Sequence, residues 1–240
     1  SFALRRSTSV EGWKAIPQVS RTLVSYNRGV WGFLEASFLS IKGKVMSKSR
    51  LEAFSDGIFA IIITIMVLDL KIPSIGTWAG IGNAAWLSTF LAYLVSFIIT
   101  ASFWVSHHLI ISNIEKVDSG VLWTNALTFL PMSLVPITTA WFGEFPTRVA
   151  PSVTYGIVYV MSVIALYNLS HAIAKHLDDP AQQKRMWRVN RSRLWLIGIG
   201  LIGTGLAFVW PPITGGMVFV ISGGWLFLRN VIHVRAIQDM

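Results

Sequence analysis

The sequence of 240 residues contains no cysteine and few charged side chains. The absence of cysteine excludes disulfide bonds, thiolate metal sites and cysteine nucleophiles. Charged residues make up 13% of the chain and hydrophobic residues 53%, whereas a soluble domain carries about 25% charged residues. Eleven tryptophans are also present, and indole rings favour the boundary between lipid headgroups and hydrocarbon. This composition predicts an integral membrane protein.

Six hydrophobic runs are long enough to cross a bilayer, which requires about 18 residues or more for a hydrocarbon core of about 30 Å. They lie at about residues 51–71, 84–106, 121–141, 152–174, 193–210 and 214–233. The sequence therefore predicts an all-α integral membrane protein with six transmembrane helices per chain. Pro131 and Pro136 should bend the third span, because proline removes a backbone hydrogen bond from a helix.

Positive charge is concentrated on one side of these predicted spans. Of the 20 Lys and Arg residues, nine lie in residues 1–50 and six between the fourth and fifth spans, whereas Lys71 and Arg148 fall on the opposite side. Such asymmetry predicts that both termini are cytoplasmic. The formal net charge of +9 then requires no nucleic acid as a partner.

Residues 1–45 differ from the remaining sequence, because polar and basic residues interrupt every apolar run. We expect an N-terminal extension that is disordered or lies as an interfacial helix on the membrane surface. Met46 resembles a natural start immediately before the first span. Residues 46–240 are therefore predicted to form the six-span domain.

The first span begins with a group of polar residues. Arg50, Phe54, Ser55 and Asp56 form the pattern R-x-x-x-F-S-D at the start of an otherwise apolar helix. Ionisable groups at membrane depth indicate a functional role. Three further motifs accompany this pattern, namely F-W-V-S-H-H at 103–108, L-W-T-N at 122–125 and G-E-F-P at 143–146.

Together these motifs resemble the transmembrane protein 175 family of potassium channels, over about residues 47–235. The resemblance is to the prokaryotic six-span members, which implies a homotetramer whose first helices line a central pore in the plasma membrane. It also implies potassium ions as the permeant species, no cofactor, no metal site and no enzymatic activity. Potassium ions, the lipid bilayer and further copies of the chain are the expected partners.

The family's pore is narrowed by apolar side chains along its first helix, and this role carries over to Ile61, Ile65 and Leu68. At 100° per residue these three side chains fall within about 60° of one another, with Thr64 beside them. Apolar rings can gate by dewetting, and the Thr64 hydroxyl is a candidate selectivity element. We expect a leak-type channel of modest selectivity. The alternatives are that the stripe packs or faces lipid, and that Thr64 bonds to its own helix.

Ser55 and Asp56 fall on other sides of the helix, about 120° and 140° away from Ile61. We expect both to turn into the protomer, where a desolvated carboxylate needs donors. The candidate partners are predicted at the same depth and are Trp104, His107, His108, Trp123 and Asn125. The motif would then be a structural anchor for the pore helix.

The two ends of the first span carry charged residues with alternative interpretations. Arg50 could line the inner vestibule, pair with Glu52 or extend towards lipid phosphates. Asp69 could form a carboxylate ring at the outer mouth of a tetramer, or a surface ion pair with Lys71. The histidines lack the spacing of a zinc site, so hydrogen bonding is favoured over pH modulation.

Two other classes of protein remain as alternatives to a channel. A secondary or proton-coupled transporter is suggested by Asp56 and the histidines, although such proteins usually show two related halves with broken helices. A membrane-embedded hydrolase would need a nucleophile or paired carboxylates at a shared depth, and the sequence offers neither.

Overall fold

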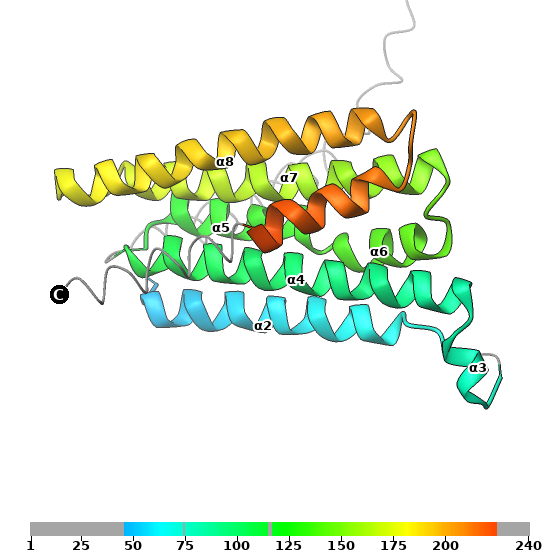
Figure 1. The fold of residues 1–240 in the computed structure, drawn as a ribbon. Coiled ribbons are helices and arrows are strands. Elements are labelled where there is room, and N and C mark those ends of the chain that lie inside the picture. The colour runs from blue at the N-terminus through cyan, green and yellow to red at the C-terminus, as the bar shows by residue number, and fades with distance from the viewer. Residues whose placement is uncertain (1–45, 74, 115–116, 225–240) are drawn as a thin grey trace, which may run out of the picture. The chain divides into compact units, whose positions relative to one another are not determined.

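The computed structural model describes residues 46–73, 75–114 and 117–224. The predicted extension over residues 1–45 lies outside the described residues, as does the last part of the sixth predicted span. The helices are α2 (Lys48–Leu68), α3 (Trp78–Ile81), α4 (Ala84–Ser112), α5 (Ser119–Met132), α6 (Val135–Glu144), α7 (Val149–Ala174), α8 (Pro180–Leu206) and a final helix, Ile213–Gly224. Figure 1 shows these long helices side by side, with α2 and α8 at opposite edges.

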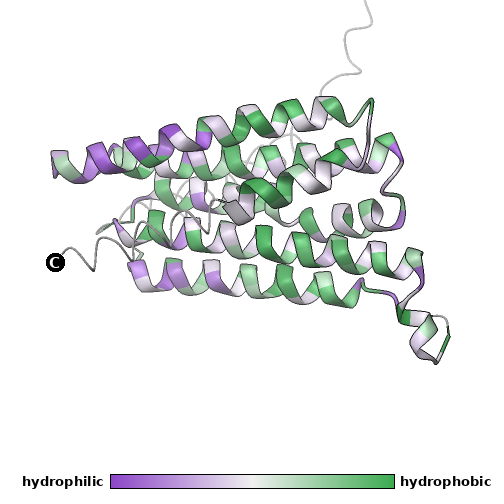
Figure 2. Cartoon of the chain, viewed as in Figure 1, coloured by the Kyte–Doolittle hydropathy of each residue, from purple (hydrophilic) through white to green (hydrophobic). Residues whose placement is uncertain are grey.

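Four stretches of the described chain are long and apolar enough to cross a membrane. They are Lys48–Leu68, Ala84–Ser112, Ser119–Glu144 and Val149–Ala174, and they correspond to the first four predicted spans. The fifth predicted span belongs to α8, which begins at Pro180 rather than near residue 193. Its first half is basic and its second half apolar (Figure 2). The sixth is represented by the shorter apolar helix Ile213–Gly224.

Local sequence explains where several helices begin and where one is interrupted. Asn83, Asp118 and Asp179 each accept a hydrogen bond from a backbone N–H of the following first turn, at 2.7–2.9 Å, which satisfies a donor that has no partner within the helix. The third span is interrupted between α5 and α6, where Pro131 and Pro136 predicted a bend. Proline lacks the N–H that would continue the helical ladder.

Helix α7 lies at the centre of the bundle and α2 at its periphery. Over their most apolar windows, 56% of α7 is buried, against 28% of α2 and 22% of α4. Glycines permit the close approach of α8 to α7, because a Cβ atom at Gly200 would lie 2.9 Å from a methyl group of Val160. A peripheral α2 leaves a long apolar face available for contacts outside the protomer.

Candidate ion pathway

Helix α2 has a buried face and an exposed face. The buried residues all lie on one side of the helix and are Leu51, Ser55, Phe59, Ile62 and Met66. The predicted constriction residues lie on the other side, where Ile61 is 57%, Ile65 43% and Leu68 81% exposed. A single protomer therefore leaves this stripe open to lipid, to another subunit or to water.

Thr64 lies beside this stripe and is exposed. Its hydroxyl donates a hydrogen bond of 2.9 Å to the carbonyl oxygen of Ile61 in its own helix. This bond uses the hydroxyl proton but leaves oxygen lone pairs that can face a cation. The Thr64 hydroxyl can thus bond to its own helix and still present its oxygen to an ion.

A buried polar network holds the start of α2 against α4 and α5. The Asn125 Nδ2 donates to Ser55 Oγ at 3.2 Å, while Asn125 Oδ1 lies 2.7 Å from His107 Nε2. Because an amide oxygen only accepts, His107 Nε2 must be the donor. Ser55 Oγ in turn donates to the carbonyl oxygen of Leu51 at 2.8 Å. All three side chains are at most 2% exposed, so the network is closed to solvent.

Aromatic rings pack against one another beside this network. The ring of Phe59 packs edge-on against His107, with centroids 5.6 Å apart, and against Phe129 at 5.4 Å. Phe54 packs edge-on against the same Phe129 ring at 6.2 Å. The polar contacts and the ring contacts together fix which face of α2 is turned inward.

Asp56 lies elsewhere than we expected. It is exposed on the protomer rather than turned into it, and its Oδ1 accepts a hydrogen bond of 2.8 Å from Trp104 Nε1. The reason is geometric, since Asp56 is displaced by about 100° from Ser55 around the helix, which places it at the rim of the buried face. His108 is also exposed, with its ring 6.1 Å from that of Trp104. The expected anchor is therefore split into a buried group and a surface group.

Of the donors predicted for the Asp56 carboxylate, Trp104 is the one that donates to it among the described residues, whereas His107 and Asn125 bond to each other and Asn125 bonds to Ser55. Trp123 forms no hydrogen bond with Asp56 or Ser55 in the described residues. It is 58% exposed on α5, two residues before Asn125 and therefore about 200° away around that helix. Arg50, at the start of α2, is exposed and forms no ion pair with Glu52 in the described part of the chain.

The far end of α2 is held by Lys71 rather than by Asp69. The Lys71 ammonium forms an ion pair of 2.9 Å with Glu144, and its carbonyl oxygen accepts a hydrogen bond of 2.9 Å from Trp86 Nε1. The alternative ion pair between Asp69 and Lys71 is absent from the described residues. Asp69 is exposed and ends the helix, so its carboxylate is available at this mouth.

A groove runs beside the exposed stripe where α2 passes the interruption between α5 and α6. Its volume is about 380 Å³, and its lining includes Ile61 and Ile65 from α2 and Ser133, Pro136 and Ile137 from the opposite wall. The groove is open and mostly apolar. Its position places an unfilled surface directly next to the candidate pore residues.

Two polar clusters inside the bundle escaped the sequence interpretation. The hydroxyl groups of Ser96, Tyr155 and Thr139 join α4, α7 and α6 through contacts of 2.9 and 2.7 Å. No motif marks them, and only their shared depth in the membrane could have suggested the contact.

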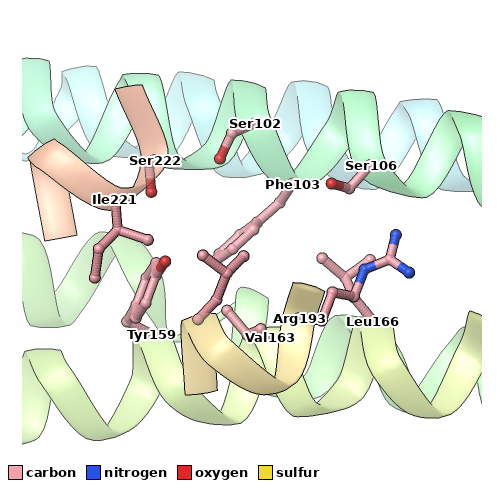
Figure 3. Close-up of a pocket in the computed structure, with 10 residues that line it drawn as sticks. Ser102, Phe103, Ser106, Tyr159, Val163, Leu166, Arg193, Ile221 and Ser222 are labelled. Carbon is pink, nitrogen blue, oxygen red and sulfur yellow. The ribbon is translucent and has the colours of Figure 1, made fainter. Parts of the chain in front are cut away.

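The second cluster surrounds a buried arginine. Arg193 is 4% exposed, and its guanidinium donates to Asn190 Oδ1 at 3.1 Å. Figure 3 shows it lining an internal cavity together with Ser102, Ser106 and Ser222. The cavity holds about 20 Å³, enough for one water molecule. The sequence contained one signal for this cluster. Arg193 falls at the edge of a predicted span, and a buried charge requires polar neighbours.

The apolar helices and the polar anchor on the first of them define a multi-pass helical membrane protein. Its motifs, fold and relatives identify the family more narrowly, because the family described as endosomal/lysosomal potassium channel TMEM175 matches residues 50–136. The chain belongs to the TMEM175 family, which is a family of channels and not of enzymes. This confirms the resemblance that the motifs indicated.

Relatives and a solved structure agree with this assignment. A protein of Chryseobacterium sp. named as a potassium channel is 37% identical over 75% of this chain and 93% of its own length. One from Streptomyces collinus with the same description is 37% identical over 69% of this chain and 84% of its own. The crystal structure of a lysosomal potassium-selective channel TMEM175 homolog from Chamaesiphon minutus superimposes with a TM-score of 0.65 at 27% identity, covering 76% of this chain and 98% of that one.

Proposed function

We propose that this chain forms a potassium-permeable leak channel as a homotetramer, with α2 from each subunit lining the central pore. The observation that carries this proposal is the exposed stripe of α2, where Ile61, Ile65 and Leu68 face away from the protomer. The names of the bacterial relatives supply the permeant ion. Each chain contributes six spans, of which α8 and the helix Ile213–Gly224 supply the fifth and part of the sixth.

The composition of the exposed face favours a pore over a lipid contact. Arg50 begins this face, Gly57 leaves an open position on it, and Thr64 adds a hydroxyl. Asp69 follows at the other end. On a face that meets only hydrocarbon, each of these polar groups would cost solvation free energy. Along a pore, the same order gives a wide polar entrance, a narrow apolar section and an acidic exit.

The groove beside the stripe supplies the place for a neighbouring subunit. A closed ring requires one surface of each subunit to fit a different surface of the next. The groove between α2 and the start of α6 is apolar and lies directly beside Ile61 and Ile65. Helix α2 of the adjacent subunit would fill it and complete the pore wall.

Selectivity in such a pore would be modest. The narrowest section is built from Ile61, Ile65 and Leu68, which offer no oxygen to replace the hydration shell of an ion. Rings of this kind control conduction by wetting and dewetting. Four Thr64 hydroxyl groups would be the oxygen ligands nearest to the constriction, so they are the candidates for preferring potassium over sodium.

The distribution of charge sets the orientation. The basic residues of α8 lie at the same end of the bundle as the start of α2 (Figures 1 and 2). By the positive-inside rule this end is cytoplasmic, so both termini are cytoplasmic. The plasma membrane of a prokaryote is the location that fits the bacterial relatives.

A secondary or proton-coupled transporter is the second candidate function. Its support is the interruption between α5 and α6, since transporters bind their substrates at broken helices near the membrane midplane. Among the described spans this is the single broken helix, whereas a transporter built from two related halves would show a corresponding break in the other half. The interruption is also explained by Pro131 and Pro136 alone.

Recordings from the purified protein in planar bilayers distinguish the two functions. A channel should give discrete single-channel current steps carried by potassium, and Ile61→Asn should increase the open-state current because it hydrates the constriction. Val67→Asn is the matched control, since Val67 is an exposed aliphatic residue of α2 that lies off the stripe. The pore assignment would have to be abandoned if potassium flux saturated at carrier rates and if Ile61→Asn changed that flux no more than Val67→Asn does.

A further inference from the structure

We propose that the outward face of the first half of α8 binds the phosphate groups of anionic phospholipids. The residues concerned, here called the basic stripe, are Lys184, Arg188, Arg191 and Trp195. They follow one another at intervals of three and four residues, which places them on one face of the helix. All four are exposed, and Trp195 is 72% exposed.

The opposite face of α8 fixes this orientation. Met186, Asn190 and Arg193 are buried there, and Asn190 joins α8 to α7 through a hydrogen bond of 3.4 Å from its Nδ2 to the carbonyl oxygen of Tyr167. Arg193 lines the internal cavity on the inner side of α8 (Figure 3). The helix therefore cannot roll to bring the basic stripe into the protein.

The same outward face continues into hydrocarbon. Beyond Trp195 it carries Ile199, Ile202 and Leu206, which are all exposed. Figure 2 shows the corresponding change from hydrophilic to hydrophobic along α8. Tryptophan is typical of the interface between these regions, so Trp195 marks the depth at which the headgroups begin.

The rise of the helix then places the arginines at headgroup depth. At 1.5 Å per residue, Arg191 lies about 6 Å and Arg188 about 10 Å beyond Trp195 along the axis. The headgroup layer is about 5–8 Å thick on each side of a bilayer, and an arginine side chain can extend towards it. Both guanidinium groups can therefore reach lipid phosphates, which suit their planar donor geometry.

No carboxylate of the protein competes for these charges in the described residues. Helix α8 contains neither Asp nor Glu, and Asp179 before it is engaged as the helix cap. Lys184, Arg188 and Arg191 take part in no ion pair with another described residue. These three positive charges are therefore available to anionic groups, and the position of the stripe on α8 favours those of the membrane surface.

Native mass spectrometry of the purified protein tests this proposal by titration with phosphatidylglycerol and, separately, phosphatidylcholine. The wild type should retain phosphatidylglycerol preferentially. The variant Arg188→Gln/Arg191→Gln should bind it about twentyfold to thirtyfold more weakly, since each basic residue near an anionic surface contributes about a fivefold effect. Arg188→Lys/Arg191→Lys should recover most of the binding, because it restores the charge.

The control variant is Lys175→Gln/Arg185→Gln, which removes the same charge at the same end of the bundle but outside the basic stripe. It should lose less phosphatidylglycerol binding than Arg188→Gln/Arg191→Gln, because Arg185 lies about 15 Å beyond Trp195 along the helix axis, further than the Debye length of about 8–10 Å over which headgroup charge acts. Equal losses in both variants would show that net charge alone attracts the lipid and would overturn the assignment. Equal retention of the two lipids by the wild type would also overturn it, as would displacement of phosphatidylglycerol by millimolar inorganic phosphate.

Discussion

Substitution of Asn125 by leucine should loosen the attachment of α2 to the bundle. Asn125 is fully buried and bonds simultaneously to Ser55 on α2 and His107 on α4. Leucine removes both bonds and leaves the His107 Nε2–H without an acceptor where water cannot enter. A buried unsatisfied donor costs about 1–3 kcal/mol, and the lost bond to Ser55 adds about 0.6 kcal/mol in a membrane protein. We therefore expect a loss of about 2–3 kcal/mol in the free energy of unfolding.

Unfolding by SDS in mixed micelles, followed by tryptophan fluorescence at constant protein concentration, measures this loss. The informative comparison is the double variant His107→Leu/Asn125→Leu, in which no unsatisfied donor remains. Because the two residues contact each other, the double variant should lose at least about 1 kcal/mol less than the sum of the single variants. Asn113→Leu is the control, since Asn113 is exposed and bonds within its own helix, and it should change stability by no more than about 0.5 kcal/mol.

Two results would refute this reasoning. The first is an Asn125→Leu protein that unfolds at the same SDS fraction as the wild type, which would mean that the network contributes nothing to the native state. The second is simple additivity of the His107 and Asn125 substitutions. Additivity would indicate that the two side chains are not hydrogen-bonded to each other in the membrane.

Three further predictions concern conduction and packing. Thr64→Ala should move the reversal potential under bi-ionic potassium and sodium conditions towards that of an unselective pore, and an unchanged potential would remove Thr64 from the selectivity argument. Asp69→Asn should reduce single-channel potassium current at 0.1 M salt but not at 1 M, because the Debye length falls from about 10 Å to about 3 Å; a salt-independent reduction would contradict the carboxylate ring. Gly200→Ala should lower resistance to SDS by about 1–3 kcal/mol, since its Cβ would lie 2.9 Å from Val160 in a closely packed interface. Gly198→Ala, whose Cβ position is open, should not lower it, and equal losses at both positions would exclude the contact as the cause.

The helical period accounts for the part of the site that the sequence predicted. Ile61, Ile65 and Leu68 share the exposed face of α2, and Ser55 turns away from them into the bundle, as a rotation of 100° per residue requires. The shared depth in the membrane pointed to Asn125 and His107 as donors for Asp56, whereas the structure joins them to each other and to Ser55, and Trp104 alone of the predicted donors reaches Asp56 in the described residues. The functional roles of these residues remain predictions.

Other features depend on contacts that a single sequence does not reveal. His107 and His108 are adjacent in the chain, yet one is buried and the other exposed, because consecutive residues point about 100° apart on a helix. Only the packing of α4 against α2 and α5 decides which one enters the core. The early start of α8 was missed for a different reason, since hydropathy detects the apolar half of a helix and not its basic continuation into water.

The attachment of α2 at its two ends has a mechanical consequence for its middle. Ser55 and Asp56 fasten one end and the Lys71 contacts fasten the other. Between them, over residues 57–68, the described side chains make no hydrogen bond to another helix, and Thr64 bonds only within α2. Torsion of these central turns about the helix axis would break no polar contact. Only the apolar packing of Phe59, Ile62 and Met66 resists it, so the section of α2 that bears the constriction is also the section with the least directional restraint.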